Sequence, residues 1–268
     1  MHPGADIELT DRGRQSLSTN RTASLASGID LPLGIGAAAS YSWSRRRQEQ
    51  TFTVPRVGRT VTWPQVDLDW RSFQSKIPHL DRVFRALNLE SRYTRDRSET
   101  GPESNESENI TVREDWNPIV GVNGTIGKGW TMRSRFGSTT SEDSDNNASI
   151  ASFTSATRRQ VAINLSRRFD PASGLRLFWK KEPIKLKSDL VFSTDLTYST
   201  DKSESGRRGF GSTVNRDGST TSIRTGVTYK FRKNIDGDLG VNLGRNNNNK
   251  TGQKLRTAAL SGSVVFTF

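Results

Sequence analysis

The sequence contains no cysteine among its 268 residues, which excludes disulfides, thiolate metal sites and cysteine nucleophiles. It is also poor in hydrophobic residues. Their share is 31%, and counting glycine while leaving out the four tyrosines gives an apolar share of about 38%, below the roughly 45–50% of ordinary soluble domains. No stretch approaches the roughly 18 consecutive apolar residues of a membrane-spanning helix, and the N-terminus lacks the pattern of a signal peptide. Three classes remain: a disordered basic chain, a β-rich sheet or repeat protein, and an outer-membrane β-barrel.

What the sequence has instead is alternation of apolar and polar residues. From Leu33 to Trp43, for example, the larger apolar residues occupy every second position, and the same period returns along the chain. Because side chains of a strand alternate between its two faces, each such segment predicts a two-faced strand. We expect an all-β fold of about twelve long antiparallel strands, near residues 5–11, 16–29, 33–45, 60–70, 87–97, 116–127, 129–141, 157–169, 186–200, 219–232, 235–246 and 253–268.

The length of these segments and of their connections favours the wall of a transmembrane barrel. Segments of about 10–13 residues suit a tilted membrane-crossing strand better than a soluble sheet. We expect long polar loops at 98–115, 142–156 and 201–218 on one side, and tight turns such as 127–129 and 233–234 on the other. Outer-membrane barrels have this asymmetry. It predicts a location in the cell outer membrane of a Gram-negative bacterium, with long loops extracellular and short turns periplasmic.

Two predicted periplasmic connections are longer than the tight turns. In 71–86, Pro78 precedes apolar residues at helical spacing, which predicts a short amphipathic helix. Residues 170–185 contain two prolines and predict a structured loop. Either connection could fold over the barrel mouth or dock a partner, or simply pack on the rim. Otherwise we expect residues 1–268 to form a single β-barrel region.

The strand pattern assigns side chains to surfaces. Aromatic residues near the strand ends predict two girdles at the membrane interfaces, formed by Tyr41, Trp43, Trp70, Trp130, Tyr198, Tyr229 and Phe231. Polar residues at the alternate positions predict a water-filled lumen of mixed charge, lined by Asp189, Ser193, Asp195, Arg224 and Lys230.

Nothing in the sequence predicts an enzyme, a cofactor or a metal. Neither His2 nor His79 has a serine or carboxylate at the spacing of a nucleophilic triad. Residues 143–147 begin like a calcium loop, but Ala148 stands where that loop needs glycine. The net charge of +12 invites a nucleic-acid interpretation, yet the basic residues are dispersed and mixed with aspartates on the predicted lumen face. We therefore expect no nucleic-acid partner.

Three stretches resemble one known family. They are Val61-Thr62-Trp63-Pro64 through Tyr93, then Asn117 to Asn123, and Leu186 to Leu190 with the closing strands. Together they resemble the C-terminal barrel region of the SprA/Sov family, giant outer-membrane translocons of type IX secretion. The resemblance implies a C-terminal fragment with Met1 as an internal start, in a barrel that conducts folded proteins across the outer membrane. It also implies a role in protein transport at the cell surface, including the secretion that supports gliding motility. The partners it implies are outer-membrane lipid, plug or accessory proteins of the translocon, and secreted cargo proteins.

The last strand is similar to the signal by which the barrel assembly machinery recognises its clients. Val264, Phe266 and Phe268 alternate and end on an aromatic residue. The assembly machinery is thus a further expected partner. An alternative function remains open from the residues: a stand-alone porin-like or structural barrel of about twelve strands.

Overall fold

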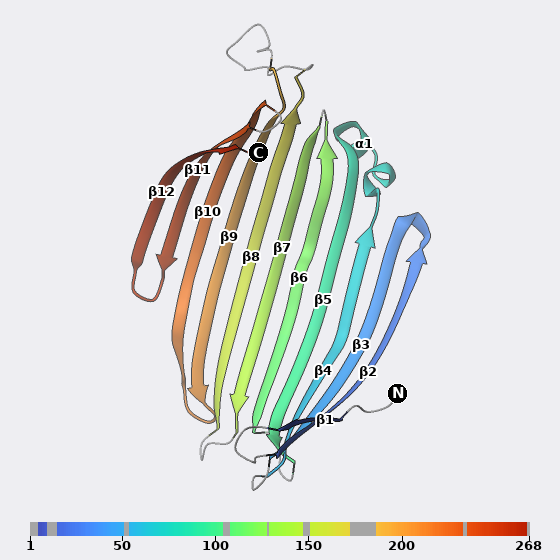
Figure 1. The fold of residues 1–268 in the computed structure, drawn as a ribbon, viewed down its shortest axis with the longest axis vertical. Helices are drawn as coiled ribbons and strands as arrows, with labels where there is room; N and C mark the ends of the chain where they lie inside the picture. The colour runs from blue at the N-terminus through green and yellow to red at the C-terminus, as the bar shows by residue number, and fades with distance from the viewer. Residues whose placement is uncertain are drawn as a thin grey trace.

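A single antiparallel sheet of twelve strands makes up nearly the whole of the computed structural model (Figure 1). The structure describes residues 5–9, 15–50, 54–103, 108–127, 129–146, 151–171, 186–232 and 235–266. Strands that are consecutive in sequence are neighbours in the sheet, from β1 to β12. They are β1 (Ala5–Leu9), β2 (Gln15–Leu31), β3 (Ile35–Gln50), β4 (Arg56–Trp70), β5 (Phe84–Pro102), β6 (Asn109–Ile126), β7 (Trp130–Asp145), β8 (Ser152–Phe169), β9 (Leu190–Arg207), β10 (Ser212–Arg232), β11 (Ile235–Asn248) and β12 (Gln253–Phe266).

The all-β class and the meander of about twelve long strands are confirmed. Each predicted segment overlaps one observed strand, because period-two alternation is set locally by the two faces of a strand. Apart from β1, the strands are 14–21 residues long, well above the usual five or six. Within the described residues no helix has the length and apolar character needed to cross a membrane.

The predicted long loops are wrong in their extent. Strand β5 continues to Pro102 and β6 starts at Asn109, so most of 98–115 is a hairpin. The same holds at 142–156 and 201–218, where β7 to β10 extend the ladder to Asp145, Ser152, Arg207 and Ser212. These strand ends are polar on both faces, as in Arg95–Thr100, so the alternation that marks a strand is missing although the backbone pairing continues.

The two ends of the sheet differ in how far the paired strands extend and in their helical turns, and not in the length of unpaired loops as predicted. At the hairpin end, defined by the connections 51–55, 103–108, 146–151 and 208–211, paired strands project far and are joined by short segments. At the opposite end, the helix end, the connection between β4 and β5 contains the 3-10 turn η2 (Phe73–Lys76) and the helix α1 (Leu80–Val83) (Figure 1). Residues 172–185, most of the predicted 170–185 loop, lie outside the described residues. The short turn η1 (Pro32–Gly34) joins β2 to β3.

The predicted helix in 71–86 forms, but it is only four residues long. Phe84 is already extended and begins β5, so the apolar residues predicted for a longer helix belong to the strand. The connection is anchored by Gln74 on η2. Its side chain accepts a hydrogen bond from the Leu87 amide at 2.8 Å and donates one to the Arg85 carbonyl at 3.3 Å. The pairing of β4 with β5 ends at Trp70 and Leu89, so the side chain of Gln74 supplies the hydrogen bonds that a longer β4 would make to Arg85 and Leu87.

The sheet is open in the described residues. Strand β12 pairs with β11 along its whole length, and no described strand pairs with its other edge. At the opposite side β1 covers β2 only from Gln15 to Thr19, so β2 from Asn20 onward is paired with β3 alone. Figure 1 shows these two edges far apart on either side of a curved wall.

Candidate functional site

One face of the sheet carries a continuous apolar band. Residues opposite each other in a ladder share a face, and the register places Val120 opposite Phe136, Phe136 opposite Val161, and Val161 opposite Tyr198. The same face continues at both ends of the sheet. Its apolar side chains include Leu25, Ile29, Ala37, Val66, Leu68, Leu89, Val122, Met132, Ile163, Leu165, Phe192, Leu196, Ile223, Val227, Leu239, Val241, Leu243, Leu260 and Val264.

The apolar band is not covered by any other part of the described chain. Leu25 and Leu260, near the two edges, are 72% and 75% exposed, and Leu239 is 57% exposed. Among the described hydrophobic residues only Phe73 and Leu87 are buried. The accessible surface is 19246 Å², whereas a compact protein of 29.8 kDa would expose about 11,600 Å². A single sheet layer thus leaves a large apolar surface that must be covered by something else.

Aromatic residues border the band in two rows. The row nearer the hairpin end contains the predicted Tyr41, Trp43 and Tyr198, with Trp63 6.1 Å from Tyr41 between ring centroids, and Tyr93 4.5 Å from Trp116. Trp63, Tyr93 and Trp116 were not among the predicted girdle residues. Trp63 and Trp116 lie beside register shifts in β4 and β6 that interrupt the alternation on which the prediction relied.

The second aromatic row lies near the helix end. Here the structure places the predicted Trp70, 5.5 Å from Phe73, and Trp130, 5.9 Å from Phe192. The other two predicted members, Tyr229 and Phe231, contact each other edge to face, with 4.9 Å between their ring centroids. This row thus consists of Trp70, Phe73, Trp130, Phe192, Tyr229 and Phe231.

An arginine on β8 is held within the second row. The guanidinium carbon of Arg167 lies 5.5 Å from the Trp130 ring centroid and 4.5 Å from that of Phe169. Cation–π contacts of this kind let a charged group remain beside aromatic rings at an interface. The row therefore combines apolar area with a positive charge, as side chains at a boundary between an apolar and an aqueous phase do.

The opposite face of the sheet is polar and carries charges of both signs. The predicted Asp195 lies opposite Arg224 and accepts a hydrogen bond from Asn164 at 2.6 Å. Ser193 lies opposite Gly226 on the same face, and Lys230 lies opposite Asp236.

The fifth predicted residue of this face, Asp189, precedes β9. Its carboxylate forms an ion pair with Arg168, and its carbonyl accepts a hydrogen bond from the Lys230 amide at 3.2 Å. The predicted polar residues thus fall on one face, and the structure distributes them over strands β9 and β10 and the segment before β9 rather than gathering them into one cluster.

A second group of polar-face contacts lies on strands β4 to β7. Arg92 pairs with Asp67 across adjacent strands, and Arg133 donates to Asn123 at 2.8 Å. Arg135 reaches Glu90 two strands away at 3.0 Å. In the described part of the chain no group of three or more acidic or histidine side chains is arranged to hold a metal ion.

The C-terminal strand presents the predicted assembly residues along the free edge of the sheet. Val264 and Phe266 lie opposite Gly237 and Ile235 of β11, and each is 57% exposed. Phe268 lies outside the described residues. The described pair therefore faces outward on the apolar side of a strand whose second edge is unpaired.

Two of the solved structures that resemble the chain are domains of autotransporters. No family model and no curated protein matches the chain. The β domain of the Bordetella autotransporter BrkA is similar over 98% of this chain and 96% of that chain, with 8% identity and a TM-score of 0.30. The transport unit of the autotransporter AIDA-I from Escherichia coli is similar over 98% of this chain and 87% of that chain, with 12% identity and a TM-score of 0.30.

Proposed function

We propose that the twelve strands form part of the wall of an outer-membrane β-barrel that conducts proteins across the membrane. The observation that carries the proposal is the one-layer sheet, with an exposed apolar band between two aromatic rows and with unpaired edges. The finer assignment, a translocon of type IX secretion that passes folded proteins, follows from the resemblance to the SprA/Sov family.

The height of the apolar band, measured along the strands between the two aromatic rows, supports the proposal that lipid covers it. On β9, Phe192 and Tyr198 of the two aromatic rows are six residues apart, a rise of about 20 Å along the strand. Adding the rings themselves brings the band close to the roughly 25 Å apolar height of outer-membrane barrels. A second protein layer would need no aromatic borders, whereas a bilayer favours tryptophan and tyrosine at both interfaces.

The free edges support a wall that other strands complete. In lipid, unpaired backbone groups cost several kcal/mol each, so a membrane sheet has to close. Within the described residues β12 does not pair with β1 or β2, which argues against the stand-alone porin-like barrel. Strands from outside this sheet would then pair with β12 and with β2 beyond Asn20.

The polar face supports an aqueous passage. It mixes Asp195, Arg224, Asp67 and Arg92 with small residues such as Ser193 and Gly226. In this proposal the hairpin end is extracellular and the helix end periplasmic. The exposed pair Val264 and Phe266 would contact the barrel assembly machinery, while plug proteins and cargo would contact the polar face. The wall performs no chemistry and needs no cofactor.

The test is to express the chain alone behind an added signal peptide, with a known closed twelve-strand barrel expressed in the same way as control. We expect this chain to aggregate or be degraded, because its edges remain unpaired. Its yield of a folded monomer that shifts on heating in gel electrophoresis should be negligible beside the control. A heat-modifiable monomer with uniform single-channel conductance would contradict the proposal and establish the stand-alone barrel.

A further inference from the structure

A row of three arginines crosses the apolar side of the sheet just beyond the aromatic row of the hairpin end. Arg21 of β2 lies opposite Arg45 of β3, and Arg45 lies opposite Arg59 of β4. All three share the face of Trp43, which stands two residues before Arg45. Like charges directly opposite each other destabilise a sheet, so this arrangement calls for an anion.

The carboxylates of this sheet only partly supply that anion. Glu103 pairs with Arg45 at 3.4 Å and with Arg47 at 2.8 Å. Glu99 lies opposite Arg59 in the ladder, and its carboxylate pairs with Arg97 at 2.7 Å. Neither Arg21 nor Arg59 forms an ion pair with any described residue. Two guanidinium groups of the row are therefore available to an external ligand.

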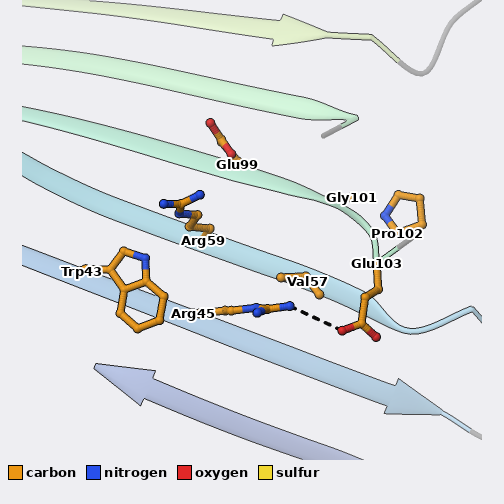
Figure 2. A pocket seen from close by; sticks show the side chains of 8 residues that line it. All are labelled: Trp43, Arg45, Val57, Arg59, Glu99, Gly101, Pro102 and Glu103. Atoms are coloured by element: carbon orange, nitrogen blue, oxygen red, sulfur yellow. Dashed lines mark hydrogen bonds and ion pairs between the residues drawn. The ribbon is translucent and has the colours of Figure 1, made fainter. Parts of the chain in front are cut away.

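The row borders a hollow that can receive such a ligand. The hollow has a volume of about 400 Å³, and its lining includes Arg45 and Arg59, the carboxylates of Glu99 and Glu103, and Trp43 and Val57. Arg21 lies beside the hollow, opposite Arg45 on the neighbouring strand. Figure 2 shows Trp43 and Arg45 on one strand, Arg59 on the next, and Glu103 reaching back toward Arg45 from the end of β5. On its apolar side, Trp43 belongs to the aromatic row of the hairpin end.

We propose that the arginine row, with Arg21 beside the hollow and Arg45 and Arg59 in its lining, binds the phosphate of an anionic lipid headgroup in the leaflet that surrounds the hairpin end. The inference rests on the proposed membrane-wall function and adds a ligand to it. Guanidinium groups recognise phosphate with paired hydrogen bonds, and a phosphate between Arg21, Arg45 and Arg59 would replace their mutual repulsion by attraction. The position fits because acyl chains would cover the band while the headgroup lies at the level of Trp43 and the arginines.

The experiment compares two charge-matched double variants of the intact protein, reconstituted from its native membrane into phosphatidylcholine. Arg21→Gln/Arg59→Gln removes the two unpaired arginines of the row. The control, Arg46→Gln/Arg133→Gln, removes two arginines of the opposite face, which donate to Ser18 and Asn123 and form no ion pair with a described residue. Spin-labelled phosphatidic acid and phosphatidylcholine report, by electron paramagnetic resonance, how strongly each lipid is immobilised on the protein.

We expect the unsubstituted protein and the control to immobilise phosphatidic acid in preference to phosphatidylcholine. In the Arg21/Arg59 variant the ratio of immobilised phosphatidic acid to immobilised phosphatidylcholine should fall by about fivefold or more. An equal loss in both variants, or no preference in the unsubstituted protein, would overturn the lipid-phosphate site while leaving the membrane wall intact. Absence of any immobilised lipid would instead overturn the membrane wall itself. An unchanged preference in the Arg21/Arg59 variant would also overturn the site.

Discussion

Arg135 of β7 forms an ion pair with Glu90 of β5 across the intervening strand β6, with 3.0 Å between guanidinium nitrogen and carboxylate oxygen. The residue of β6 that lies between them in register is Gly121. A Cβ atom at that position would lie 2.5 Å from Glu90 Cγ and 2.9 Å from Pro118 Cγ. The pair can therefore form over β6 only because Gly121 leaves the space empty.

The first prediction concerns this space. Gly121→Ala should displace the Glu90 side chain, break its pair with Arg135 and destabilise the folded wall by about 1–3 kcal/mol through overpacking. The measurement is the denaturant midpoint of the membrane-embedded protein. Gly226→Ala is the matched control, since a Cβ there meets only Ser193 Oγ at 3.6 Å and Leu239 O at 3.8 Å. Equal midpoints for the two variants would disprove the role of Gly121.

The second prediction tests the two faces of the wall. Leu196→Arg or Ile223→Arg, which lie opposite each other between the two aromatic rows, places a charge on the apolar band and should block assembly, since such a charge costs roughly 2–4 kcal/mol near the bilayer centre. Ser193→Arg and Thr228→Arg, on the polar face of the same two strands, should be tolerated. The readout is heat-modifiable folding in outer-membrane fractions. If both pairs of variants fold equally well, the assignment of the faces is wrong.

The third prediction tests the orientation of the sheet. Arg207 ends β9, and the connection to β10 contains Arg208 and Phe210, of which Phe210 is 67% exposed. Trypsin added to intact cells should cut there. Arg71 and Lys76, in the connection at the helix end, should be cut only after the outer membrane is permeabilised. Peptide mass analysis distinguishes the sites, and the reverse order of cleavage would invert the proposed topology.

The fourth prediction concerns Gln74, whose side chain completes the pairing of β5. Gln74→Leu leaves the Leu87 amide and the Arg85 carbonyl without their partner and should cost about 1–3 kcal/mol. Hydrogen exchange at the Leu87 amide should accelerate accordingly. Gln74→Glu retains an acceptor for Leu87 and should protect that amide better than leucine does. Unchanged exchange in the leucine variant would show that Gln74 does not hold this end of β5.

Sequence reasoning located the strands and their faces because both depend on local alternation. From Leu190 to Tyr198 most alternate residues are apolar and those between them are mainly polar. The register of β9 with β8 and β10 places the two sets on opposite faces of the sheet. It missed the hairpin extensions because stretches such as Arg95–Thr100 are polar on both faces. It also missed Trp63 and Trp116 as members of an aromatic row, since register shifts displace them from simple alternation.

The sequence by itself thus determined the class of fold, the twelve segments and the apolar and polar faces, because the alternation of a strand's side chains depends only on consecutive residues. Only the tertiary structure decided which residues meet across strands. Arg135 pairs with Glu90, and the Leu87 amide donates to Gln74. The register of the strands places Arg21 opposite Arg45 and Arg45 opposite Arg59. The open edges of β2 and β12 were likewise decided there, because closure depends on how the curvature of all twelve strands accumulates.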